Sequence, residues 1–229
     1  MSNNTQVETL KKSIPFIAIP LVNVLFSPKA FFENKKGNFK KRYDFIFIIL
    51  LNFIVTYFIS NQLLKSEALM NNLKDFEFSE SLIRVIKIIV TFGSVIPLLF
   101  SVVFTSIVLL IALKISKIKL NFEKTFYIIF LAQLPLIISK LTLLIPGVAQ
   151  DGINTLRITG FGYAFQNISD NLFLITFFNE IDLFVIWSYF LIGLGISILG
   201  NVSIKRAAIV SGSLWLLSAV VLSTIKLIY

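Results

Sequence analysis

Long apolar runs with few charges constrain this chain of 229 residues more than any other feature of its sequence. A helix needs about 17–25 predominantly apolar residues to cross a hydrocarbon core of about 30 Å. Runs of roughly this length occur at residues 44–64, 88–113, 125–145, 181–199 and 207–227. The pattern predicts an all-α fold, a polytopic membrane bundle of five transmembrane helices.

The composition agrees with a membrane protein and argues against a soluble domain. Hydrophobic residues make up 56% of the chain and charged residues 14%, and the mean hydropathy is +0.87. Soluble domains average about 45–50% apolar and about 25% charged residues. A soluble fold of this length could not bury so much apolar surface, so the bilayer is the expected solvent.

Residues that usually carry catalysis or bind metals are missing from the sequence. The chain has no Cys and no His, which excludes disulfides, Cys/His zinc sites and the usual ligation of haem or iron–sulfur clusters. It also contains no P-loop, dinucleotide fingerprint, nucleophile elbow or HExxH motif. We therefore expect no cofactor, no metal site and no catalytic residues, and we expect that the protein is not an enzyme.

The charges divide unequally between the two sides of the predicted bundle. With five spans, the N-terminal segment, the second loop and the fourth loop share one side, which holds 14 basic and four acidic residues. The other side holds seven basic and eight acidic residues, so the two sides carry +10 and −1 of the net +9. The positive-inside rule then predicts a cytosolic N-terminus and an external C-terminus. The basic side also suits binding to anionic lipid headgroups. Because no basic face carries interleaved aromatic residues, we expect no nucleic-acid partner.

Residues 1–43 are predicted to form a cytosolic N-terminal segment, followed by a five-helix membrane domain at residues 44–229. Residues 14–32 combine apolar side chains with Pro15, Pro20 and nearby lysines, a pattern typical of a helix lying in the membrane interface. Packing on the inner mouth of the bundle explains the same pattern equally well. The stretch lacks a small-residue cleavage site, so we do not interpret it as a signal peptide.

Three side chains inside the predicted spans, Asn52, Gln133 and Lys140, are candidates for intramembrane polar contacts. Polar groups at this depth usually form interhelical hydrogen bonds, worth about 0.6 kcal/mol each. Lys140 stands five residues before the outer end of the third run. We expect its ammonium to extend outward to the membrane surface, with an ion pair to Glu180 or Asp182 as the alternative.

Two carboxylates, Glu180 and Asp182, stand at the outer start of the fourth run. Carboxylates at this place cap free backbone N–H groups and complement the helix dipole. An acid/base or cation site is the alternative, but residues two apart on a helix point apart by about 200°. We therefore expect helix capping.

Two of the predicted spans contain a proline. Pro97 and Pro135 are expected to kink the second and third helices and to free backbone carbonyls. Because broken helices occur at transporter sites, a small transporter or channel with a polar path through the bundle is the alternative function.

Small residues at four-residue spacing in the last two runs indicate close helix packing, either inside the bundle or at a homo-oligomer interface. The pairs are Gly193 with Ser197, Ala207 with Ser211, and Ala208 with Gly212.

Several short motifs follow one another along the chain, among them EIDLFVIW at residues 180–187. This motif resembles the acidic-x-Phe-x-x-Trp start of the fourth helix in the YIP family of Ypt/Rab-interacting membrane proteins, in particular its bacterial branch, with Asp182, Phe184 and Trp187 as the family signature. Other similar motifs are LFSPKAFF at 25–32, AQLP at 132–135, GLG at 193–195 and NVSIKRA at 201–207. In order and spacing, the resemblance extends over nearly the whole chain.

The resemblance implies a compact five-helix membrane bundle without established catalytic residues. Eukaryotic members help to organise Golgi and secretory membranes and bind prenylated Rab GTPases, through cytosolic regions longer than the first 43 residues here. Some bacterial members look like accessory partners of ABC-type exporters or envelope-stress systems. We therefore expect a non-enzymatic scaffold or accessory subunit in membrane trafficking, export or envelope maintenance, located in a bacterial cytoplasmic (cell) membrane. Its expected partners are the lipid bilayer and another membrane protein, such as an ABC-type exporter or a second copy of the chain.

Overall fold

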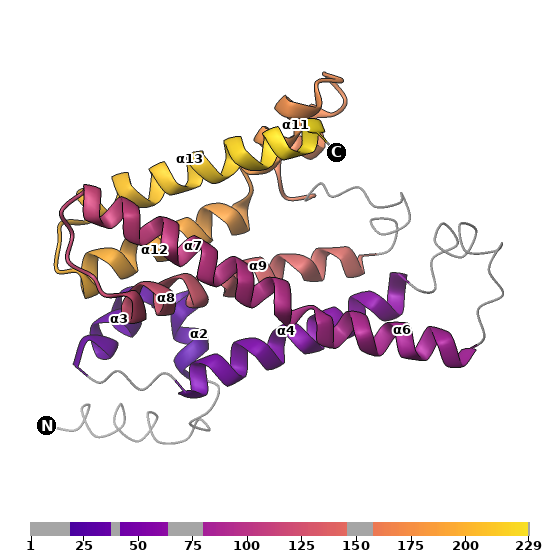
Figure 1. Cartoon of the computed structure of the whole chain (residues 1–229), viewed down its shortest axis with the longest axis horizontal. Coiled ribbons are helices and arrows are strands. Elements are labelled where there is room, and N and C mark those ends of the chain that lie inside the picture. Colours follow the sequence, from indigo (N-terminus) through magenta and orange to yellow (C-terminus); the bar gives the residue numbers. More distant parts are fainter. Residues whose placement is uncertain (1–18, 38–41, 64–79, 146–157, 229) are drawn as a thin grey trace, which may run out of the picture.

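The described part of the chain is built from helices joined by turns and short connections. The computed structural model describes residues 19–37, 42–63, 80–145 and 158–228, and these ranges contain no β-strand. The prediction of an all-α fold is confirmed. Figure 1 shows the long helices lying roughly side by side, so that their ends gather at two opposite ends of the molecule.

In the part of the chain that the structure describes, four helical stretches are long and apolar enough to cross a membrane. The first is α4 (Arg42–Leu63). The second, Ser81–Ile115, joins α6 (Glu80–Gly93) to α7 (Val95–Ile115). The third covers 23 residues and consists of α8 (Phe122–Leu131), α9 (Gln133–Ser139) and the 3-10 helix η1 (Lys140–Leu144). The fourth is α13 (Ile204–Ile228), with 25 residues.

The helix at the fourth predicted span is shorter than the others. α12 (Leu183–Leu199) has 17 residues, or about 26 Å at 1.5 Å per residue, against about 30 Å for a hydrocarbon core. Two short helices precede it, α10 (Phe161–Phe165) and α11 (Leu172–Asn179). Both α11 and α12 pack against α13. Among the described residues, four stretches are therefore long enough to cross a membrane, and α12 is a shorter apolar helix.

The second helical stretch begins earlier than the apolar run that predicted it. α6 starts at Glu80, whereas the run starts at residue 88. The ammonium of Lys87 donates a hydrogen bond to Asn61 Oδ1 at 2.9 Å and lies 4.0 Å from the centroid of the Tyr57 ring. These contacts hold a charged turn of α6 against α4, so the helix continues beyond the apolar run. Residues 64–79, between the first and second apolar runs, lie outside the described residues.

Two of the long stretches are interrupted three residues before a proline. Ser94 separates α6 from α7, and Pro97 is the third residue of α7. Ala132 separates α8 from α9, and Pro135 is the third residue of α9. Proline has no N–H, and its ring clashes with the carbonyl four residues earlier, which accounts for a break at this spacing.

The two described N-terminal helices pack on the bundle. α2 spans Ile19–Phe26 and α3 spans Pro28–Gly37, and α3 packs against α12. Val24, Phe31 and Phe32 are buried in the same hydrophobic core as α8 and α12. These three side chains therefore pack on the bundle, and an interfacial position of the same stretch stays a prediction. Residues 14–18 lie outside the described part of the chain.

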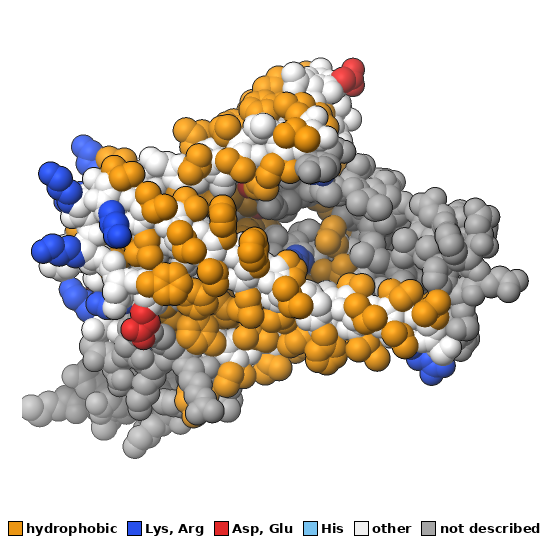
Figure 2. All heavy atoms as spheres, viewed as in Figure 1, with side chains coloured by type: hydrophobic (Ala, Val, Ile, Leu, Met, Phe, Trp, Pro, Cys, Tyr) orange, Lys and Arg blue, Asp and Glu red, His pale blue; other side chains and the backbone are white. Residues whose placement is uncertain are grey.

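The core is centred on α8, α9 and α12. Half of the third stretch is buried, against 22–33% of the other three. Gly195 allows α12 to approach closely, because a Cβ there would lie 2.9 Å from Ile128 Cγ1 and 3.1 Å from Phe32 Cζ. The outer helices instead expose large apolar side chains, which form a broad band across the middle of the face shown in Figure 2. Exposing apolar surface to water costs about 25 cal/mol per Å², so an exterior of this kind faces lipid.

Candidate functional site

Most of the described Lys and Arg side chains gather at one end of the bundle, which we call the basic end (Figure 2). It consists of α3, the α7–α8 connection and the α12–α13 connection (Figure 1). Two contacts hold these parts together. Lys36 Nζ donates to Asn201 Oδ1 at 3.1 Å, and the Arg206 guanidinium donates to the carbonyl of Ser116. The basic residues are Lys29, Lys35, Lys36, Lys114, Lys117, Lys119, Lys124, Lys205 and Arg206.

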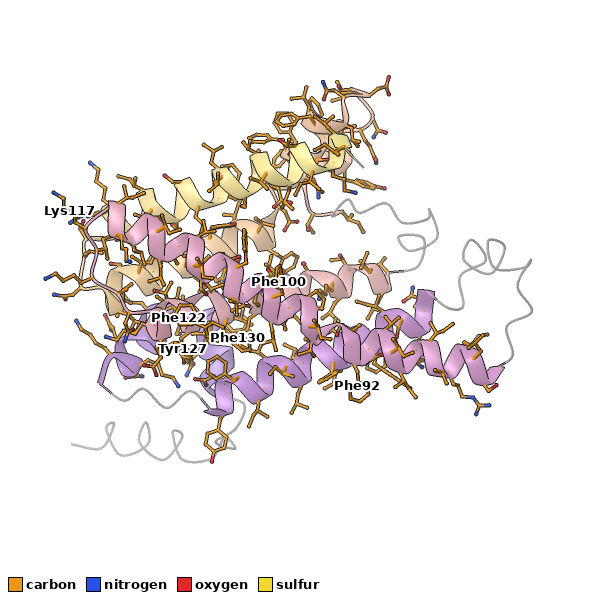
Figure 3. All side chains as sticks on the ribbon, viewed as in Figure 1. Phe92, Phe100, Lys117, Phe122, Tyr127 and Phe130 are labelled. Atoms are coloured by element: carbon orange, nitrogen blue, oxygen red, sulfur yellow. The ribbon has the colours of Figure 1, made fainter. Side chains whose placement is uncertain are left out.

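A buried carboxylate joins three helices just inside the basic end. Asp44 Oδ2 lies 2.6 Å from the ammonium of Lys35 and accepts a hydrogen bond from the Tyr127 hydroxyl, also at 2.6 Å. The Lys35 ammonium also lies over the rings of Phe31 and Tyr127, at 5.4 and 5.7 Å from their centroids. We call Lys35, Asp44 and Tyr127 the Asp44 cluster. It connects α3, α4 and α8, and Figure 3 shows Tyr127 beside the packed aromatic side chains of α8.

Each member of the Asp44 cluster is placed by its own helix. Asp44 is in the first turn of α4, where a negative charge complements the helix dipole. Lys35 is in the last turn of α3, where a positive charge does the same. Sequence reasoning counted both charges only for topology and did not single out Tyr127. The sequence signal that could have indicated this cluster is Asp44, an acidic residue just after the basic residues that precede the first span.

A second polar cluster lies deeper in the bundle and contains two of the three predicted intramembrane residues. Lys140 Nζ donates to Asn52 Oδ1 at 3.1 Å, and Asn52 Nδ2 donates to Ser94 Oγ at 3.0 Å. Ser94 Oγ in turn donates to the carbonyl of Thr91 at 2.7 Å. We call Asn52, Ser94 and Lys140 the Asn52 cluster. It connects α4, the α6–α7 break and η1, and Asn52 is fully buried.

The environment of Lys140 differs from both sequence-based expectations. Its ammonium donates to Asn52 on a neighbouring helix, a partner that neither expectation named. The third candidate, Gln133, is the first residue of α9, is half-buried and takes no part in this cluster. The α6–α7 break near Pro97 contributes to the cluster because Ser94 stands in it.

Asp182 caps the start of α12, as the sequence predicted. Its Oδ1 accepts hydrogen bonds from the backbone N–H groups of Phe184 at 2.9 Å and of Val185 at 3.0 Å. Its Oδ2 accepts from the hydroxyl of Thr159, and the side chain is fully buried. The capping interpretation is confirmed for Asp182.

The residues around Asp182 have separate environments. Glu180 is at the C-terminal end of α11, and its carbonyl accepts from the Trp215 indole at 3.1 Å. Trp187 is 37% exposed and its ring centroid lies 5.6 Å from that of Phe190. Because Asp182 is buried and Trp187 faces outward, the signature residues Asp182, Phe184 and Trp187 do not form a single site. Nowhere in the described ranges do three acidic side chains converge as metal ligands would.

The pairs of small residues divide between an inner and an outer face. Gly193 of α12 contacts α13 closely, because a Cβ there would lie 2.8 Å from Ser211 Oγ, and Ala207 is fully buried. Ala208 and Gly212 are exposed, and a Cβ added at Gly212 would have no atom within 4 Å. The first two pairs therefore pack inside the bundle, and the third faces outward.

Comparison with known proteins assigns the chain to a family. The family model of the Yip1 domain matches residues 22–225, a range that extends from α2 into the last turns of α13. No curated protein and no solved structure matches the chain. With four helical stretches in its described part that are long and apolar enough to cross a membrane, the chain belongs to the YIP family of integral membrane proteins, defined by the Yip1 domain.

Proposed function

We propose that this protein is a non-enzymatic, five-span member of the YIP family that acts as a scaffold or accessory subunit of another membrane protein. The processes it serves are membrane trafficking, export or envelope maintenance, and its location is a bacterial cytoplasmic membrane. The N-terminus and the basic end face the cytosol, and the C-terminus is external. This orientation follows from the positive-inside rule, because the basic end carries most of the described positive charge.

The path of α12 supports five spans. α12 ends at the basic end, and α13 starts there and runs back to the C-terminus (Figure 1). The two helices pack against each other, with close approach at Gly193. A helix of 17 residues is a few ångströms shorter than the hydrocarbon core. Local thinning of the bilayer accommodates that difference at modest cost.

The observation that carries the proposed role is the use of the buried ionisable side chains. Ionisable residues within a membrane are candidates for functional sites by default. Here Asp44 bonds to Lys35 and Tyr127, Asp182 caps α12, and Lys140 bonds to Asn52. These contacts link helices or complete a helix end. They therefore support a structural framework rather than a reaction centre.

The outward face of α13 is the surface that we propose for the partner. Ala208 and Gly212 lie on it beside a shallow cavity of about 340 Å³, which is also lined by Phe190 and Trp215. Small residues on a lipid-facing helix let a second transmembrane helix approach closely. The occupant we propose is a transmembrane helix of an exporter subunit. A second copy of this chain is the alternative outcome of the test.

Site-specific photo-cross-linking in native membranes tests this role. A photoreactive residue is introduced at Gly212 of the full chain, and the matched control carries it at Phe104 of α7, which is 61% exposed on another helix. We expect an adduct with an ABC-type exporter subunit from position 212 and not from position 104. Adducts with lipid alone from both positions would contradict the proposed partner, and an adduct with the chain itself would replace the exporter by a homo-oligomer. Turnover of a lipid or peptide, or solute flux through proteoliposomes, by the purified protein would overturn the accessory role.

A further inference from the structure

A basic pocket lies between the end of α7 and the start of α8, at the basic end of the bundle. Its volume is about 620 Å³, and its lining includes Lys114, Lys117, Lys119 and Lys124. No carboxylate is among the described residues that line it. Four positive charges this close in the chain repel one another. The pocket is therefore suited to a ligand that brings negative charge.

Backbone hydrogen bonds fix the shape of the α7–α8 connection. The N–H of Ile118 donates to the carbonyl of Leu113 at 2.8 Å, and the N–H of Lys117 donates to that of Lys114 at 3.0 Å. This pair of bonds is the Schellman arrangement that ends many helices. Ile118 is also buried in the hydrophobic core. The lysines thus project from an ordered connection, so little conformational entropy of the backbone is lost when a ligand binds.

Lys117 occupies a backbone conformation that favours glycine. Its φ of 54° is left-handed, and this conformation costs free energy for a residue with a Cβ. Orientation of a membrane protein requires only that positive charge lies on the cytosolic side, and a neighbouring position would serve equally well. The Schellman arrangement requires the left-handed conformation at this position, and a lysine in place of the usual glycine adds a positive charge to the lining of the pocket. Figure 3 shows Lys117 at the tip of the basic end, where its side chain points away from the helices.

Two exposed apolar residues place the pocket at the membrane surface. Ile115 at the end of α7 is 78% exposed, and Phe122 at the start of α8 is 47% exposed. In an integral membrane protein, apolar side chains exposed at helix ends contact lipid. The lysines between them are therefore at the level of the lipid phosphates, where lysine side chains reach the headgroups.

We infer that this pocket binds the headgroup of an anionic phospholipid such as phosphatidylglycerol. The phosphodiester oxygens accept hydrogen bonds from the lysine ammonium groups, which each carry three donors. The acyl chains lie along the apolar flanks at Ile115 and Phe122, and a free phosphate would leave these flanks unused. This site is additional to the scaffold role and does not depend on it.

Titration of lipid into the purified full chain tests the site. Phosphatidylglycerol or phosphatidylcholine is added to the protein in a neutral detergent, and native mass spectrometry gives the fraction bound. We expect the wild type to prefer phosphatidylglycerol. Lys117→Gln with Lys119→Gln should weaken that binding about 30-fold, since each well-placed lysine contributes about fivefold near an anionic headgroup.

Matched variants separate a pocket from general attraction to positive charge. Lys29→Gln with Lys205→Gln removes the same charge from the basic end outside the pocket and should leave the affinity within about threefold of wild type. Lys117→Arg should retain binding, while Lys117→Gly should lose about fivefold without loss of thermal stability, because it relieves the left-handed conformation. Equal losses in the two double variants, or no preference over phosphatidylcholine, would overturn the inference. Displacement of the lipid by equimolar glycerol phosphate would assign the pocket to a soluble phosphate and also overturn it.

Discussion

The ammonium of Lys35 lies 2.6 Å from the carboxylate of Asp44, which is only 3% exposed. This ion pair joins α3, which precedes the first membrane-spanning stretch, to the start of that stretch in α4. Tyr127 of α8 donates to the same carboxylate oxygen. α3 is therefore fixed to the bundle by a buried ion pair as well as by apolar packing.

Asp44→Asn should destabilise the protein by about 3 kcal/mol, because it leaves the Lys35 ammonium without its counter-charge in a buried position. Adding Lys35→Met to this variant should recover part of the loss. The measurement is the free energy of unfolding in a mild detergent. Glu33→Gln is the control, because its ion pair with Lys29 is long, at 4.0 Å, and exposed, and should change stability by less than about 0.5 kcal/mol. Equal effects of Asp44→Asn and Glu33→Gln would show that the buried pair is not structural.

The hydrogen bond between Lys140 and Asn52 should appear as an energetic coupling. We expect the single variants Asn52→Ala and Lys140→Met and their double variant to give a coupling of about 0.6–1.7 kcal/mol in a double-mutant cycle. Gln133→Ala replaces Asn52→Ala in the control cycle, and that cycle should be additive. A coupling near zero at Asn52 would mean that the Lys140 ammonium has another partner.

Gly195→Ala should destabilise the bundle by about 1–3 kcal/mol, because the added methyl group meets Ile128 and Phe32 in a packed core. Gly212→Ala is the matched control on the outward face, where a Cβ has open space. That substitution should be neutral or stabilise by about 0.5–1 kcal/mol, since alanine favours a helix more than glycine does. Thermal unfolding of both variants measures the two effects. A larger loss of stability for Gly212→Ala than for Gly195→Ala would contradict the packing of α12 on α8.

Asp182→Ala should cost about 1–2 kcal/mol, because it removes the acceptor for two backbone N–H groups of α12 and for Thr159. Asp182→Asn keeps one capping oxygen and should lose less. Both stabilities are read from unfolding in detergent. If the asparagine variant lost as much as the alanine variant, the role of Asp182 would lie in its charge rather than in capping.

Features set by local sequence were predictable, whereas features set by distant contacts were not. The apolar runs located α4, α7, α8–η1 and α13 because the thickness of a bilayer dictates their length. Capping by Asp182 involves residues two and three positions away and was also predicted. The apolar run begins at residue 88 and did not indicate that the same helix starts at Glu80, because the contacts of Lys87 are with residues of another helix.

The two polar clusters also depend on contacts between residues that are distant in the sequence. Tyr127 and Asp44 are 83 residues apart in the chain, and Lys140 and Asn52 are 88 apart. Asn52 and Lys140 could be selected as candidates because polar residues in apolar runs are conspicuous. That they would bond to each other, and that Ser94 would join them, depends on how the helices pack, which no local pattern in the sequence records.

The sidedness of two loops tests whether this protein is a five-span bundle whose basic end faces the cytosol. A reporter fused after Lys119 lies in the connection at the basic end, and one fused after Asp151 follows the third helical stretch. We expect cytosolic activity for the fusion after Lys119 and external activity for the fusion after Asp151. An external reporter after Lys119, or both reporters on the same side, would contradict this topology.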